Sequence, residues 1–303
     1  MSLPAIQLLD VTKHFGPRAA VSGLSLEIPE GACYGLIGPN GAGKTTTFSL
    51  LCGFLRPTAG EVRVLGRDVR DASALKGRVG VLPQDAQLPA GWKLGALLTY
   101  WARLSGVDAP ERAAREALDK VALSEAWAQP ANALSHGMTK RAALAQALLG
   151  SPPIVLLDEP TAGLDPKVAA LVRQLVEEMR GKRTVLISSH NLEELERLCD
   201  GAAILDHGKL AQAGPMGELT GSAVEFRVEI ARGEVPLSQL RTLPGVKEAL
   251  MEASGHLLIR HDPREPAAED VIAEVVRLLL AEGVRFRGIS RGQRLEARVL
   301  QIT

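Results

Sequence analysis

GPNGAGKTT, residues 38–46, holds three glycines, a lysine and two threonines within one short stretch. The order fits the pattern G-x-x-x-x-G-K-[ST], in which glycines let successive backbone N–H groups converge on an anion without obstruction by a Cβ atom. CYGLI before it predicts a buried strand, and TTTFSLLCGFL after it predicts a helix that ends before Pro57. A strand, a glycine loop and a helix N-terminus together indicate a phosphate-binding site rather than an ordinary glycine-rich turn.

The residues of this loop have separable expected roles. Lys44 is expected to reach the β- and γ-phosphates of a nucleotide as a point charge, and the Thr45 hydroxyl is expected to ligate Mg²⁺. The other candidate nucleotide contacts are the remaining residues of the stretch, namely Gly38, Pro39, Asn40, Gly41, Ala42, Gly43 and Thr46.

The overall composition limits the partners and the compartment. Lysine plus arginine (35) equals aspartate plus glutamate (35) over 303 residues, so no net field attracts nucleic acid, and we expect no nucleic-acid partner. The three cysteines, Cys33, Cys52 and Cys199, lack the spacing of a zinc site or a disulfide framework, which fits a reducing compartment.

The hydropathy pattern predicts a cytoplasmic chain. The N-terminal residues lack the basic segment and apolar core of a signal peptide. No apolar run reaches the ~18 residues that a membrane span requires. We therefore expect any passage through a membrane to be supplied by another chain.

Residues 1–220 are predicted to form one α/β domain around the phosphate loop. Alternating segments within residues 5–35 predict half-buried strands, and GEVRVLG and RVGVLPQ predict two more. The alanine-rich block that follows, about 87–150, has helical spacing and no strand signal, which predicts an inserted helical subdomain. PPIVLLDE and TVLISSH predict buried strands, DPKVAALVRQLVEEMR an amphipathic helix with Asp165 as N-cap, and AAILDHGKL a hairpin. Strands that alternate with helices predict a mostly parallel, covered sheet.

The pattern changes after residue 220. VEFRVEIA, VKEALMEA, HLLIRHD and VRFRGIS predict strands, with SQLRTL and AEDVIAEVVRLLLAEG as helices between them. This order predicts a small accessory α+β domain of ferredoxin-like pattern over residues 222–303.

Two acids end one of the buried strands. IVLLDEP places Asp158 and Glu159 where successive side chains point to opposite sides, so one acid can face a metal while the next faces an attacking water. Asp158 is the Mg²⁺ candidate, and Glu159 is the group expected to orient or deprotonate water for in-line attack on a γ-phosphate. A helix N-cap or an exposed turn acid is the alternative for such a pair.

Two further polar residues follow strands. His190 ends TVLISSH, at the edge of the sheet that should hold the ligand, which favours a contact with the γ-phosphate or with water. Gln84 follows VGVLP, but a glutamine in a loop carries little information by itself.

Taken together, these segments resemble the ATP-binding cassette (ABC) family. The resemblance covers residues 5 to about 220 and depends on five elements in this order: GPNGAGKTT, Gln84, LSHGM, IVLLDEPTAGLDP and His190. It implies a phosphate-loop NTPase fold with a helical subdomain, and ATP and Mg²⁺ as cofactors.

The resemblance also implies a dimer in which each ATP lies between the phosphate loop of one cassette and the signature segment of the other. Ser135 and Gly137 would then contact the γ-phosphate in trans, and Asp165 would shape the dimer seam. Gln84 would touch the metal and the nucleotide and report their state to a membrane partner. The second cassette is expected to be another copy of the chain.

Two positions depart from the family pattern. The signature is usually LSGGQ-like, whereas here it is Leu134, Ser135, His136, Gly137 and Met138. Met138 cannot form the hydrogen bonds of a glutamine, so the trans contacts are expected to differ. The aromatic residue that stacks on adenine, commonly tyrosine, would be Phe15, which could equally be a core residue.

The function that the resemblance implies is ATP hydrolysis coupled to transport. The chain is expected to be an ATPase subunit at the inner face of the membrane, bound to a transmembrane permease on a separate chain. The accessory domain and the closing segment RLEARVLQIT loosely resemble the exporter branch of the family, although a domain that only braces the dimer explains them equally well. The alternatives are a non-transport ABC ATPase and a nucleotide-dependent scaffold.

Overall fold

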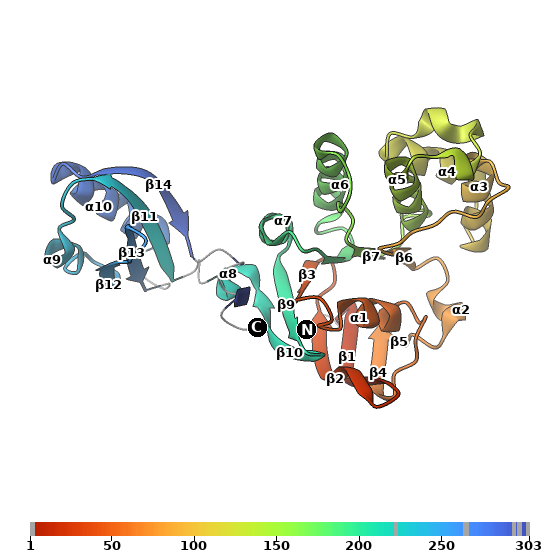
Figure 1. The fold of residues 1–303 in the computed structure, drawn as a ribbon, viewed down its shortest axis with the longest axis horizontal. Helices are drawn as coiled ribbons and strands as arrows, with labels where there is room; N and C mark the ends of the chain where they lie inside the picture. The colour runs from red at the N-terminus through yellow and green to blue at the C-terminus, as the bar shows by residue number, and fades with distance from the viewer. Residues whose placement is uncertain (1–3, 221–223, 263–266, 293–294, 296–298, 301–303) are drawn as a thin grey trace. The chain divides into compact units, whose positions relative to one another are not determined.

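The strand before the phosphate loop, β3 (Cys33–Ile37), is buried along its whole length. The structure is a computed structural model, and it describes residues 4–220, 224–262, 267–292, 295 and 299–300. The chain divides into two units, the first up to Gly214 and the second from Pro215 (Figure 1).

Unit 1 is built on a six-stranded sheet in the order β10-β9-β3-β8-β7-β6. Its other strands are β6 (Val79–Leu82), β7 (Ile154–Asp158), β8 (Thr184–Ser188), β9 (Gly201–Asp206) and β10 (Lys209–Pro215). All neighbours from β6 to β9 pair in parallel. Continuous apolar runs form these strands because both faces of a parallel sheet are covered. The carboxyl ends of β3, β7 and β8 therefore meet at one edge.

A second, four-stranded sheet in the order β2-β1-β4-β5 lies in the same unit. Its strands are β1 (Ile6–Phe15), β2 (Arg18–Ile28), β4 (Ala59–Val64) and β5 (Arg67–Asp68), and every neighbouring pair is antiparallel. One hydrophobic core joins both sheets: it contains Leu8 and Leu24 of the second sheet, Leu36 of β3, and Phe48 of α1 (Lys44–Leu51).

Helix α1 is shorter than the sequence predicts. The pattern of TTTFSLLCGFL extends to residue 55, whereas the helix ends at Leu51. Gly53 has φ 70°, a left-handed conformation that commonly terminates helices. Phe54 and Leu55 after Gly53 keep the apolar spacing of a helix, but they lie outside α1.

The helical subdomain leaves the sheet after β6 and returns to it at the neighbouring β7. It contains α3 (Leu94–Leu104), α4 (Pro110–Lys120), the short helices η1 (Ser124–Ala128) and η2 (Ala131–Ala133), and α5 (His136–Ala147). Figure 1 shows α3, α4 and α5 gathered together. Since β6 and β7 are adjacent and parallel, the insertion does not interrupt the sheet.

Three further helices complete the connections of unit 1. They are α2 (Ala72–Leu75), α6 (Pro166–Met179) and α7 (Leu192–Leu198). The Asp165 carboxylate accepts hydrogen bonds from the backbone N–H groups of Lys167 and Val168, so Asp165 caps α6 as its position before Pro166 indicates.

Unit 2 has the topology β-α-β-β-α-β. After α8 (Met216–Leu219) come β11 (Glu225–Arg232), α9 (Leu237–Leu240), β12 (Val246–Met251), β13 (His256–His261), α10 (Ala268–Ala281) and β14 (Arg285–Arg291). The strand order β12-β13-β11-β14 and the antiparallel pairing define a ferredoxin-like arrangement. SQLRTL forms only a single helical turn, α9, and most of RLEARVLQIT lies outside the described residues.

Within the described part of the chain, no helix combines the length and the apolar character that a membrane span needs.

Each unit has its own core, and this can be tested at Phe226. Phe226 is fully buried in the unit 2 core with Val271, Val275 and Leu279. Phe226→Ala should lower the free energy of unfolding of unit 2 by about 3–5 kcal/mol because it leaves a cavity. The transition of unit 1 should not change, and tryptophan fluorescence isolates it because Trp92, Trp101 and Trp127 all lie in unit 1.

Phe54→Ala is the matched control, since Phe54 is 71% exposed. Denaturant unfolding followed by circular dichroism reports both units. A fluorescence transition displaced together with the dichroism transition in Phe226→Ala would contradict separate cores.

Candidate functional site

The phosphate loop is held so closely against the two sheets that glycine is required. A Cβ atom on Gly43, which has φ 102°, would lie 2.7 Å from the carbonyl oxygen of Ala20 in β2. A Cβ atom on Gly38 would collide with the carbonyl oxygen of Leu205 in β9. The loop thus connects β3 to α1 while lying in contact with both sheets.

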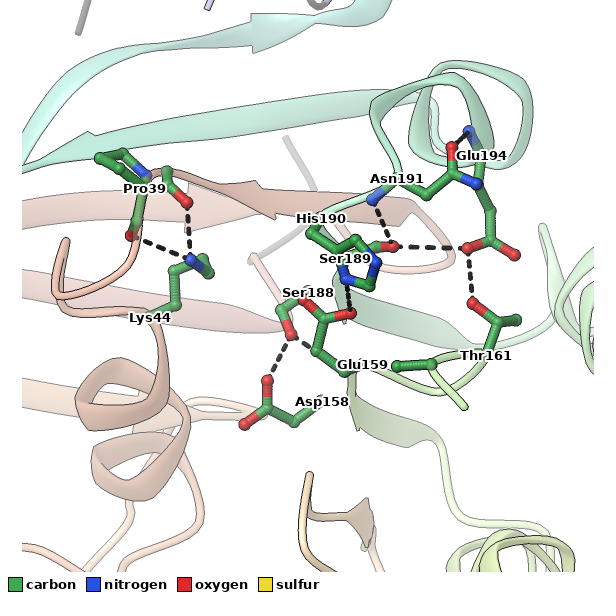
Figure 2. Close-up of polar contacts among 12 residues, drawn as sticks. Pro39, Lys44, Asp158, Glu159, Thr161, Ser188, Ser189, His190, Asn191 and Glu194 are labelled. Atoms are coloured by element: carbon green, nitrogen blue, oxygen red, sulfur yellow. Dashed lines mark hydrogen bonds and ion pairs between the residues drawn. The ribbon is translucent and has the colours of Figure 1, made fainter. Parts of the chain in front are cut away.

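Lys44, the first residue of α1, lies back over this loop (Figure 2). Its ammonium group donates hydrogen bonds to the carbonyl oxygens of Gly38 (2.6 Å) and Pro39 (3.1 Å). Burial lowers the pKa of Lys44, and the nearby carboxylates of Glu159 and Asp158 oppose that shift. An anionic ligand in the loop would favour the protonated, positively charged form of Lys44, as these two carboxylates do.

Asp158 and Glu159 lie at the end of β7, but strand alternation does not orient both. Asp158 is the last residue of the strand and accepts a short hydrogen bond from the Ser188 hydroxyl of β8. Glu159 lies beyond the strand with φ 50°, a left-handed conformation that is rare for glutamate. The expectation that strand alternation orients Glu159 is therefore wrong, because its left-handed backbone sets the direction of the side chain.

The two acids differ in their surroundings. Burial raises the pKa of Asp158, and the hydrogen bond from Ser188 opposes that shift. The Glu159 carboxylate lies 2.7 Å from Nδ1 of His190, whose ring is 76% exposed. His190 thus contacts the candidate catalytic acid (Figure 2).

A third carboxylate supports the loop after β7. Glu194, buried in α7, accepts a hydrogen bond of 2.7 Å from the Thr161 hydroxyl. The loop between β7 and α6 is thereby attached to α7 as well as to β8.

One cavity of about 380 Å³ brings most of the predicted site residues together. Its walls are formed by Phe15, Arg18, Ala20, Asn40, Gly41, Gly43, Lys44, Thr45, Thr46, Gln84, Asp158 and Glu159. Phe15 is 50% exposed, with the Lys13 ammonium 5.3 Å from its ring centroid, so it is not a core residue.

The signature residues and Asp165 do not line this cavity. Ser135 is the N-cap of α5, and its hydroxyl accepts a hydrogen bond of 3.3 Å from the backbone N–H of Met138. Ser135 and His136 are exposed, and the imidazole of His136 lies near Gly163 in the loop before α6.

Sequence reasoning missed three residues at the site. Arg18 lines the cavity beside Phe15, Ser188 bonds Asp158, and Lys140 of α5 donates hydrogen bonds to the loop after β7. Ser188 had a usable signal, because it ends a buried strand next to β7. Lys140 had none, because its contacts depend on how the helical subdomain packs.

Comparison with known proteins agrees with this geometry. The chain is 35% identical over 262 residues to the Nod factor export ATP-binding protein I of Ralstonia nicotianae, covering 85% of this chain and 81% of that protein. The chain belongs to the ABC transporter ATP-binding family. The family profile matches residues 21–162, and this ATP-binding subunit is accordingly an ATPase.

Other relatives of this ABC protein extend over its full length. The Nod factor export ATP-binding protein I of Rhizobium etli is 33% identical over 314 residues, covering 100% of this chain and 94% of that protein. That of Paraburkholderia xenovorans is 34% identical over 304 residues, with 99% and 97% coverage.

Solved structures show the same cassette. A dimeric ATP-binding cassette in a post-hydrolysis state, bound to ADP and Pi, is 26% identical with a TM-score of 0.64, covering 70% of this chain and 98% of that one. A bacterial ABC exporter with ATP bound is 26% identical with a TM-score of 0.65, covering 73% of this chain and 40% of that one. Cassettes of this family dimerise and work with transmembrane partners.

The close approach of the phosphate loop to β2 predicts that Gly43→Ala greatly weakens nucleotide binding. The new methyl group must displace the loop from the Ala20 carbonyl, and this would move the backbone N–H groups expected to bind the phosphates. Gly91→Ala is the control, because Gly91 also has a positive φ (82°) but open space around its Cβ position. Titration with a fluorescent ATP analogue should separate the two variants, and equal affinity in both would contradict the steric argument.

Proposed function

We propose that the chain is the ATPase subunit of an exporter and that it hydrolyses Mg²⁺-bound ATP with Glu159 as the residue that orients the attacking water. The observation that carries this proposal is the convergence of Lys44, Asp158 and Glu159 on one cavity, with His190 bonded to Glu159. These groups come from three different strand ends, which is the arrangement expected of a site rather than of a structural ion pair.

The donor set at the cavity fits Mg²⁺. Thr45, Gln84 and Asp158 offer oxygen ligands, which this ion prefers. Among the described residues no cluster of three or more histidine, cysteine or acidic side chains could hold a metal. Mg²⁺ usually takes only one or two protein ligands and completes its shell with phosphates and water, so the sparse set is suitable. Bound there, the ion would neutralise charge on the phosphates.

The other residues at the cavity would each have a separate role in binding or hydrolysing ATP. Lys44 would exchange its two loop carbonyls for phosphate oxygens and stabilise the charge of the transferring group. The Glu159 carboxylate would accept a hydrogen bond from the attacking water, and His190 would hold that carboxylate in place. Phe15 and Arg18 would receive the adenosine side of the nucleotide.

The site is completed by a second copy of the chain. Ser135, His136, Gly137 and Met138 lie at an exposed helix N-terminus outside their own cavity, where backbone N–H groups can meet the γ-phosphate of a partner. The dimeric relative with ADP and Pi supports this arrangement. The His136 ring lies near Gly163, two residues before Asp165. Asp165 would therefore lie at the seam between the two cassettes.

A transmembrane permease on a separate chain would dock beside the Gln84 loop. A groove of about 510 Å³ is lined by Phe54, Leu75, Val81, Pro83 and Gln146, and Phe54 is 71% exposed. Pro83 lines this groove while its neighbour Gln84 lines the nucleotide cavity. A cytoplasmic segment of the permease seated in the groove would thus sense the nucleotide and hold the chain at the inner face of the membrane. Relatives named for export support the direction of transport.

Glu159→Gln should lower kcat for ATP hydrolysis by about a hundredfold or more, because it removes the carboxylate that accepts the proton of water. ATP should still bind, because the phosphate loop and Lys44 do not change. Steady-state phosphate release and nucleotide titration measure the two properties separately. Glu178→Gln, an exposed substitution on α6, is the control and should keep wild-type activity. Substantial hydrolysis by Glu159→Gln would remove Glu159 from this role.

A further inference from the structure

Lys140 is a buried cation, and no carboxylate among the described residues forms an ion pair with it. It is 6% exposed, and no other lysine or arginine in the described part of the chain is buried. Its ammonium group donates hydrogen bonds to the carbonyl oxygens of Glu159 (2.6 Å) and Ala162 (2.7 Å). Removing such a charge from water is costly, so its two hydrogen bonds to carbonyl oxygens must offset the cost of burying the ammonium group.

Those two acceptors belong to the loop that carries the catalytic carboxylate. The peptide groups on both sides of Glu159 are held: its N–H donates to the carbonyl and hydroxyl oxygens of Ser188, each at 3.1 Å, and its C=O accepts from Lys140. Together these bonds fix both backbone dihedrals of a residue at φ 50°. A conformation so rarely populated persists only where the surroundings hold it, and the Glu159 side chain takes its direction from it.

Lys140 also connects two parts of the site. It lies in the second turn of α5, whose N-terminus presents Ser135 and His136. The helix that carries the signature is therefore bonded directly to the catalytic loop of its own chain.

We propose that Lys140 is a positioning residue for ATP hydrolysis: from the signature helix, it holds the Glu159 backbone in the conformation that aims the carboxylate at the attacking water. This rests on the proposed role of Glu159. Lys140 does not line the nucleotide cavity, and its ammonium group bonds the backbone of the loop that carries Glu159. Its effect should therefore appear in kcat and depend on Glu159.

The test compares Lys140→Met with Arg141→Met. Arg141 is the adjacent cation on α5 and also donates to two carbonyl oxygens, those of Val121 (3.2 Å) and Ala122 (2.9 Å), but both lie within the helical subdomain. Lys140→Met should lower kcat by about tenfold or more and change KM for ATP by less than about threefold, because a small displacement of a reacting group costs rate rather than binding. Lys140→Arg, which can still donate two hydrogen bonds, should recover most of the activity. Arg141→Met should keep kcat within about twofold of wild type.

A double-mutant cycle shows whether the effect passes through Glu159. In the Glu159→Gln background, Lys140→Met should cause no further loss in single-turnover hydrolysis, since the carboxylate that Lys140 positions is absent. If Lys140→Met does not yield folded protein, Lys140→Gln serves in the same cycle.

Three results would overturn the proposal: unchanged kcat in folded Lys140→Met, equal losses in Lys140→Met and Arg141→Met, or fully additive losses with Glu159→Gln. The proposed function is tested separately, because it requires only that wild type hydrolyse ATP and Glu159→Gln not do so. Its failure is therefore visible before any Lys140 variant is made.

Discussion

The contact between the phosphate loop and the two sheets is the constraint on which the rest of the site depends. Side chains at Gly38 and Gly43 would collide with main-chain carbonyls of β9 and β2, so the loop can approach both sheets only without Cβ atoms. That approach places Lys44 at the carboxyl edge of the parallel sheet, opposite the ends of β7 and β8. The shared core of the two sheets, which includes Phe48 of α1, keeps the arrangement in place.

Several elements hold the residues at the carboxyl end of β7. Ser188 of β8 bonds both Asp158 and the backbone of Glu159, Glu194 of α7 holds Thr161, and Lys140 of α5 holds the carbonyls of the same loop. A left-handed glutamate is tolerated because these contacts over-determine it. The same loop leads to Asp165 at the start of α6, so a partner that engages this region would act on the backbone that continues from Glu159.

The sequence predicted the phosphate loop, the buried parallel strands and the ferredoxin-like order of unit 2, because spacing and alternation are local properties. It did not predict the end of α1 at Leu51, where a left-handed Gly53 overrides the apolar spacing. Nor did alternation predict the direction of Glu159, since the residue leaves the strand. Lys140 and Arg18 were missed for a different reason: their partners are distant in sequence and come close only through packing.

The central claim is that ATP is bound between two copies of the chain, with the signature helix acting in trans. Light scattering behind a sizing column, on Glu159→Gln with and without Mg²⁺ and ATP, tests it most directly because slow hydrolysis traps the closed state. The account predicts a monomer without nucleotide and a dimer with it, and a monomer in both conditions once Ser135→Arg blocks the signature. A Glu159→Gln chain that binds ATP and stays monomeric, or a dimer that survives Ser135→Arg, would contradict the account.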